Sequence, residues 1–268
     1  MDFLSKLWFG FTTAMKGAPL TVGVSILAVI IGLILGFVLA MMRRSRFRIL
    51  RVVSGVYIDI IRGTPMVVQA LIFAYGVPQL MQKNGIPFRW PELIIPCMVV
   101  CGMNSAAYMA EIIRGGLQAV EKGQTEAAMS LGMTHSQTMR LVVLPQAFRI
   151  ILPSLGNEFV TMIKETAVLS YAGAVEILRR AALLSAATFE TFTAYIGAAL
   201  AYMVFTIPLS KLVLLMEKKL SGKGIKAEAK DTSSMLEPEE EPDPTDASEE
   251  EIEATILANE TASQRETR

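Results

Sequence analysis

Long apolar segments limit the structures that this chain can adopt. The run Pro19–Met42 is longer than the roughly 20 residues that an α-helix needs to cross a bilayer. Further segments of this kind are Val52–Leu80, Leu93–Ala110, Ala147–Ile163 and Phe192–Met216. Because backbone polar groups inside a bilayer must bond to one another, these segments are expected to be helical. The sequence therefore predicts an all-α integral membrane protein with about five transmembrane helices.

Basic residues predict the orientation of these helices. Arginines cluster at positions 43–51, directly after the first predicted span, and lysines cluster at positions 211–230, around the end of the fifth. Basic residues concentrate in cytoplasmic loops, so the N-terminus is predicted outside and the C-terminus inside. Arg179 and Arg180 lie on the predicted outer side and run against this rule.

Both ends of the chain differ from the predicted transmembrane domain, residues 19–220. Residues 1–18 place Trp8, Phe11 and other apolar side chains on one face, which predicts a short interfacial helix. Residues 231–268 hold thirteen of the 25 acidic residues but only two of the 25 basic ones. The region 221–268 is therefore predicted to be a disordered acidic cytoplasmic tail, with a docking or regulatory role left open. The basic remainder is expected to face anionic lipid, not nucleic acid.

A polar stretch, Glu126–Pro145, separates the third and fourth predicted spans. Thr125 is a plausible N-cap for a helix that ends at Gly132. Thr134 or Ser136 can then cap a second helix. A short helix, a glycine turn and a second helix are therefore expected before Pro145 interrupts the apolar run. Such a module can dock into a groove of a partner protein.

The spacing in this stretch resembles the coupling loop of bacterial ATP-binding cassette importer permeases. A Glu-Ala-Ala triplet is followed after three residues by glycine, and after nine more by an aliphatic residue, one residue, and Leu-Pro. The matching positions are Glu126, Ala127, Ala128, Gly132, Val142, Leu144 and Pro145, with Val142 where the family usually has isoleucine. The resemblance implies that these residues couple the chain to an ATPase subunit.

A second string, Ile61–Pro78, resembles the Arg-Gly-Thr-Pro motif of permeases for polar amino acids in the same superfamily. Gly63 and Pro65 are expected to break the helix, and Gln69 is expected to face the bundle interior. The segment before the coupling loop also resembles this family, with Glu111 and Arg114 spaced to pair and Gly115 and Gly116 expected to end the helix. The family-motif positions are Arg62, Gly63, Thr64, Pro65, Glu111, Arg114 and Gly115.

The fourth predicted span carries a polar face that a lipid-facing helix would not need. Its sequence resembles the same permeases, with Glu165 and Ala167 where Asp and Ser are common. The deepest charge, Glu158, has two interpretations. It meets the ammonium or a cationic side chain of an amino acid, or it pairs with Arg149 or Lys164 of the same or a neighbouring chain. The predicted substrate pathway comprises Gln69, Asn157, Glu158, Thr161 and Lys164.

These resemblances cover roughly residues 5–220 and imply the type I importer permease fold. The glycine-rich phosphate loop of ATPases is absent, so ATP and magnesium are expected on a separate ATPase subunit. No catalytic or metal site is predicted, and the chain is not expected to be an enzyme. The other expected partners are an extracytoplasmic amino-acid-binding protein, a second permease subunit and lipid of the bacterial plasma (inner) membrane.

The alternative is a different class of protein, a stand-alone secondary carrier or channel for small polar solutes. A carrier would usually show an internal repeat with paired broken helices, and the sequence shows no clear repeat. A carrier also gives no reason for the spacing in residues 126–145. The sequence therefore favours the permease subunit, and leaves open which amino acid it carries and whether it forms a homodimer or a heterodimer.

Overall fold

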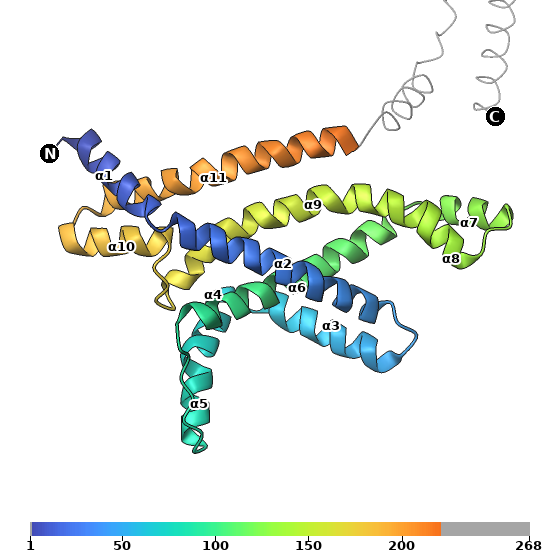
Figure 1. Ribbon diagram of the computed structural model, residues 1–268, viewed down its shortest axis with the longest axis horizontal. Coiled ribbons are helices and arrows are strands. Elements are labelled where there is room, and N and C mark those ends of the chain that lie inside the picture. Colours follow the sequence, from blue (N-terminus) through green and yellow to red (C-terminus); the bar gives the residue numbers. More distant parts are fainter. Residues whose placement is uncertain (1, 221–268) are drawn as a thin grey trace, which may run out of the picture. The chain divides into compact units, whose positions relative to one another are not determined.

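The computed structural model describes residues 2–220, and every element in that range is helical (Figure 1). The predicted acidic tail, residues 221–268, lies outside the described residues. Within residues 2–220, four helices are long and apolar enough to cross a membrane, and a bent helix pair brings the number to five if it counts as one span. The four are built on α2 (Ala18–Arg43), α6 (Ile94–Gln118), α9 (Leu144–Glu165) and α11 (Thr191–Leu220).

The pair α2 and α6 forms the centre of the bundle, and small residues allow its close packing. The buried side of α2 repeats every four residues and includes Ala28, Gly32 and Gly36. A Cβ atom at Gly32 would lie 2.5 Å from Oγ of Ser105, and one at Gly36 would lie 2.6 Å from Cβ of Met109. Small residues on helix faces permit such contact inside membranes, where water does not drive helices together.

The second predicted span is not one straight helix. It consists of α3 (Arg48–Gly63), α4 (Met66–Leu71), a π-helical turn η1 (Ile72–Gly76) and α5 (Val77–Lys83). The chain bends by 102° between the two halves, so α5 projects away from the bundle in Figure 1. The break falls at Pro65, which lacks a backbone N–H and disfavours helix at the preceding residue.

The predicted end of the third span at Gly115 and Gly116 is wrong, because α6 continues to Gln118. At Gly116 the absence of a side chain serves packing. A Cβ atom there would lie 2.2 Å from Cγ1 of Ile151, so the glycine lets α6 and α9 approach each other. Nothing lies within 4 Å of the equivalent point at Gly115.

Two short helices, α7 (Lys122–Ser130) and α8 (His135–Thr138), connect α6 to α9. The predicted N-cap at Thr125 is wrong, because α7 begins three residues earlier. Pro145 does not interrupt the helical segment either. A π-helical turn, η2 (Met139–Val143), leads directly into α9, and Pro145 occupies its first turn, where a missing N–H is tolerated.

At the end of the bundle away from α7 and α8, the N-terminal helix α1 (Phe3–Met15) packs against α11 (Figure 1). Glycines make this contact close. A Cβ atom at Gly10 would lie 2.5 Å from the carbonyl oxygen of Thr193, and one at Gly197 would lie 2.4 Å from the backbone nitrogen of Phe11. The helix α10 (Ile177–Thr188) completes this end. The interfacial position of residues 1–18 stays a prediction.

Candidate functional site

A cavity of about 450 Å³ lies where the break between α3 and α4 faces α6 and α9. At the break, backbone groups and polar side chains face the cavity within the membrane-spanning region. A continuous helix would have its backbone groups bonded to one another there. The lining carries both signs of charge. Its residues are Arg62, Gly63, Thr64, Pro65, Met66, Asn104, Tyr108, Glu158, Thr161, Met162 and Glu165.

Glu158 is the buried acidic group of this cavity, with 8% of its surface exposed. The hydroxyl of Ser105 on α6 donates to its Oε1 atom at 3.3 Å. None of the ion pairs within residues 2–220 involves Glu158, and the two basic residues considered as its partners, Arg149 and Lys164, are both exposed. Among the residues that the structure describes, Glu158 is therefore held by a neutral hydroxyl.

The cavity includes some of the predicted pathway residues and omits others. Thr161 lines it beside Glu158, whereas Asn157 and Lys164 are exposed on α9 and are not part of its wall. Asn104 and Tyr108 complete the wall from α6 and were not predicted as pathway residues. The available signal for Asn104 was its polarity inside a predicted span, since polar groups at such positions usually face the interior of the bundle.

Gln69 stabilises the break and does not line the cavity. Its Nε2 atom donates to the carbonyl oxygen of Ile61 at 2.9 Å, and to the carbonyl oxygen and Oγ1 of Thr64 at 3.1 and 2.8 Å. The carbonyl groups near the end of α3 lose their helical partners at Pro65. The amide of Gln69 therefore replaces backbone donors that the break removes.

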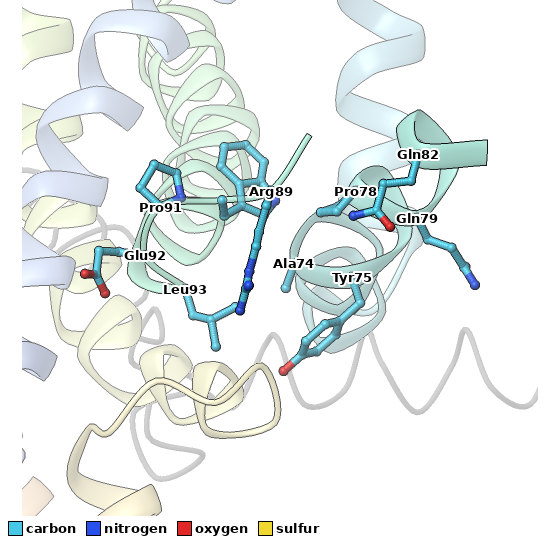
Figure 2. A pocket seen from close by; sticks show the side chains of 10 residues that line it. Ala74, Tyr75, Pro78, Gln79, Gln82, Arg89, Pro91, Glu92 and Leu93 are labelled. Carbon is cyan, nitrogen blue, oxygen red and sulfur yellow. The ribbon is translucent and has the colours of Figure 1, made fainter. Parts of the chain in front are cut away.

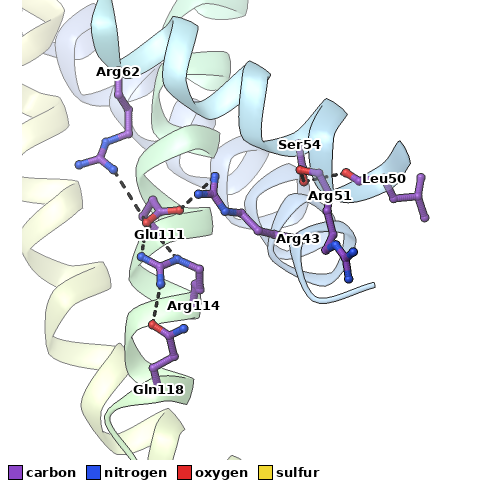
Figure 3. A network of polar contacts seen from close by, with 8 residues as sticks. All are labelled: Arg43, Leu50, Arg51, Ser54, Arg62, Glu111, Arg114 and Gln118. Atoms are coloured by element: carbon purple, nitrogen blue, oxygen red, sulfur yellow. Dashed lines mark hydrogen bonds and ion pairs between the residues drawn. The ribbon is translucent and has the colours of Figure 1, made fainter. Parts of the chain in front are cut away.

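Glu111 on α6 lies among three arginines (Figure 3). Nε of Arg114 donates to its Oε2 atom at 3.0 Å, so the predicted pair is present. Nη1 of Arg43, at the end of α2, lies 3.8 Å from Oε1, and Nη1 of Arg62 lies 4.0 Å from Oε2. One carboxylate thus faces three guanidinium groups, which leaves a surplus of positive charge beside the cavity.

The same network connects the cavity to the end of α6. Arg62 lines the cavity and its guanidinium lies over the ring of Tyr108, 5.1 Å from the centroid. Beyond Glu111, Nη1 of Arg114 donates to Oε1 of Gln118, the last residue of α6 (Figure 3). Side chains in contact therefore lead from the cavity towards the start of α7.

The turn between α7 and α8 is fixed by two capping motifs. Gly132 has φ 83°, its N–H donates to the carbonyl of Met129, and the N–H of Met133 donates to that of Ala128. This is the Schellman pattern, which requires a left-handed residue after the helix. Thr134 then caps α8 in a capping box with Gln137. The predicted stop at Gly132 and the predicted cap at Thr134 are both confirmed.

The α7–α8 module exposes apolar side chains at one end of the bundle. Leu131, in the turn between the two helices, is 86% exposed, and Leu141, in the adjoining η2, is 69% exposed. Of the predicted coupling residues, Ala128 is buried, and the others are exposed: Glu126, Ala127, Gly132, Leu144 and Pro145. These exposed side chains are accessible to another protein.

A larger cavity of about 870 Å³ lies at the base of α5 (Figure 2). It is lined by α5 and by the segment that leads into α6, with Arg89 and Glu92 as its charged residues. Nearby, Nε1 of Trp90 donates to the carbonyl oxygen of Phe73 at 2.7 Å and so ties this segment to η1. None of the predicted site residues lines this cavity.

A helical membrane bundle with a charged cavity at a broken helix, and an exposed two-helix module at one end, defines a transporter subunit that works with a partner. Over residues 28–222 the chain matches the family described as binding-protein-dependent transport system inner membrane component. The chain belongs to this family. The predicted type I importer permease fold and the predicted role as a permease subunit are confirmed, whereas the orientation in the membrane and the acidic tail stay predictions.

Named relatives align over most of their length. The chain is 38% identical over 208 residues to the arginine transport system permease protein ArtQ of Bacillus subtilis, covering 78% of this chain and 92% of the relative. It is 34% identical over 219 residues to the putative glutamine transport system permease protein GlnP of Rickettsia felis, covering 82% of this chain and 98% of the relative.

Two solved structures have a fold similar to that of this chain. The crystal structure of an amino acid ABC transporter with histidines is 40% identical, with a TM-score of 0.74 over 82% of this chain and 99% of that chain. The MetNI methionine ABC transporter, at 18% identity and a TM-score of 0.50, supports the fold alone. Family membership implies a separate ATPase subunit, which binds ATP, and a second permease subunit. The chain is a transporter component and not an enzyme.

Proposed function

We propose that the 450 Å³ cavity holds a polar α-amino acid on its way through the membrane. The observation that carries this proposal is the presence of opposite charges in the lining of one cavity, with Arg62 on α3 and the two glutamates on α9. Arg62 suits the α-carboxylate, because guanidinium groups bind carboxylates in a planar fork. Glu158 and Glu165 suit the ammonium group. Asn104 and Thr161 add hydrogen-bonding groups to the lining.

One further observation supports an amino acid over other small solutes, and a second supports a small-molecule site in general. Relatives are named for arginine and glutamine transport, both of which share this pair of charged groups. The cavity volume also falls in the range of roughly 300–1,000 Å³ that is usual for small-molecule sites. The side chain of the transported amino acid would lie towards the remaining wall, formed by Met66, Tyr108 and Met162.

The partners follow from the two ends of the bundle. The exposed α7–α8 module is proposed to dock on the ATPase at the cytoplasmic face of the bacterial plasma (inner) membrane. An extracytoplasmic amino-acid-binding protein would deliver the substrate from the opposite face. A single copy leaves Asn157, Thr161 and Lys164 exposed on α9, and a second permease subunit is proposed to close the pathway against this face.

Derivatives with one charged end blocked test the cavity. In the purified permease–ATPase complex without the binding protein, calorimetry should detect binding of an amino acid such as arginine or glutamine. N-acetylation and esterification of the carboxylate should each weaken binding, on the order of tenfold or more, because each removes a charge-assisted hydrogen bond worth about 1.5–3 kcal/mol. Equal binding of all three forms would contradict the proposal.

The proposed orientation has its own test. Cysteines are introduced at Lys83, at the end of α5, and at Ser136, in α8; both residues are exposed. An impermeant thiol reagent applied outside intact cells should label Lys83→Cys and should leave Ser136→Cys unlabelled. The native Cys97 and Cys101 are buried and keep the background low. Permeabilised cells, in which both variants should react, provide the control, and the reverse pattern would invert the topology.

A further inference from the structure

An apolar groove of about 630 Å³ lies between α2 and α9, away from the charged cavity. Its floor belongs to a buried cluster that includes Ile113 and Ile151, and its walls expose Phe37 and Phe148, at 55% and 59%. Arg44 is the only charged residue in its lining. The groove thus offers apolar contact throughout and one positive charge at one end.

The length of the groove matches one leaflet of a bilayer. Along α2 it extends from Leu33 to Arg44, and along α9 from Leu155 to Leu144. Each stretch advances by eleven residues, which is about 17 Å at 1.5 Å per residue. The hydrocarbon core of a bilayer is about 30 Å thick, so the groove spans roughly half of it. Arg44 is the C-cap of α2 and Leu144 is the first residue of α9. The C-terminal end of α2 and the N-terminal end of α9 both point towards the end of the bundle that carries α7 and α8 (Figure 1).

Arg44 differs from its neighbour Arg43 in its partners. The side chain of Arg43 faces Glu111, as Figure 3 shows, and so contributes to the network beside the charged cavity. Arg44 is exposed, and it forms none of the ion pairs found within residues 2–220. A guanidinium at the mouth of an apolar groove binds a phosphate readily, and anionic lipids are concentrated in the cytoplasmic leaflet.

We propose that this groove is a binding site for an anionic phospholipid of the cytoplasmic leaflet, with one acyl chain along α2 and α9 and its phosphate on Arg44. The leaflet assignment rests on the orientation proposed above. A helix of a second permease subunit fits the groove less well. Such a helix carries side chains along its whole length, and nothing in it fixes an anion at the end of the groove where Arg44 lies. Met139 of η2 lies in the same wall, so the lipid would contact the base of the α7–α8 module.

The test measures lipid retention by the assembled complex of the full chain with its ATPase and second permease subunit. Detergent-purified complex is incubated with equal amounts of phosphatidylglycerol and phosphatidylcholine, washed, and analysed by native mass spectrometry. The wild type should retain phosphatidylglycerol in preference. Arg44→Gln should lower the retained phosphatidylglycerol about fivefold, the effect of roughly one arginine near a membrane surface.

Two variants make the test specific. Arg46→Gln removes the same charge two residues away and outside the groove, and it should retain lipid as the wild type does. Met41→Trp fills part of the groove from its exposed wall and should lower retention of both lipids. Equal losses in the Arg44 and Arg46 variants, or no loss with Met41→Trp, would overturn the proposal. Disulfide crosslinks between permease subunits through Phe148→Cys would also overturn it, by showing that protein occupies the groove.

Retention in detergent requires neither transport nor a particular topology. A negative result in the lipid test would therefore not contradict the proposed amino acid cavity. If the topology were reversed, the lipid groove would lie in the other leaflet.

Discussion

Replacing Gly132 by leucine should lower ATP-driven uptake by roughly five- to thirtyfold while the protein remains in the membrane. The structure assigns the cause to the backbone. Gly132 has φ 83°, and no atom lies within 4 Å of the point where a Cβ would stand, so there is room for a side chain within this chain. A left-handed conformation costs an ordinary residue about 1–2 kcal/mol, which corresponds to that range of population change.

Relief of this strain would disrupt the turn that joins α7 and α8. The Schellman bonds at Met129 and Ala128 need the left-handed residue, and the orientation of α7 depends on them. A reoriented α7 would present Leu131 and Ala127 wrongly to the ATPase. We therefore expect ATP hydrolysis to become independent of substrate, or the ATPase to dissociate during purification.

Two further variants separate the backbone effect from a steric clash with the ATPase. Asparagine tolerates the left-handed region, so Gly132→Asn should keep more uptake than Gly132→Leu. Gly123→Leu adds the same side chain to α7, where there is space and no left-handed conformation, and should have a small effect. Full uptake by Gly132→Leu would argue against the coupling role, and equal losses in the leucine and asparagine variants would indicate close contact with the ATPase.

The spans were predictable because the length of each apolar segment can be read from the sequence. The observed α2 and α11 differ from the predicted limits by only a few residues at each end. Glycine was a weaker guide, because a glycine can end a helix or let another helix approach. At Gly116 only the position of Ile151 decides between these uses. Pro65 predicted a break, but the 102° bend depends on packing that the local sequence does not contain.

The site was only partly predictable for a related reason. Glu158 and Thr161 share a face of one helix, so helical periodicity brought them together. Arg62, Asn104 and Tyr108 reach the cavity from α3 and α6, and nothing in their local spacing connects them to α9. Gln69 was correctly expected in the interior, but its amide bonds to the broken backbone at Thr64 and does not line the 450 Å³ cavity.

Glu158→Gln should weaken amino acid binding to the purified complex by roughly 10- to 100-fold and lower uptake accordingly. Glutamine keeps the size of the side chain and can still accept the hydrogen bond from Ser105. It loses the negative charge, and a hydrogen bond to a charged group contributes about 1.5–3 kcal/mol. Because no ion pair holds Glu158 within residues 2–220, the charge itself has no structural role there that its removal would disturb.

Folding and function can be separated with matched variants. Thermal unfolding of Glu158→Gln should stay close to that of the wild type, and Glu217→Gln, which removes an exposed carboxylate outside the cavity, should bind and transport normally. Loss of assembly in Glu158→Gln would instead show that the carboxylate pairs with a basic group of a neighbouring subunit, which is the structural alternative considered for this residue. Unchanged affinity together with unchanged uptake would remove Glu158 from the pathway, and Arg62 would then have to select the substrate without an opposing charge from this residue.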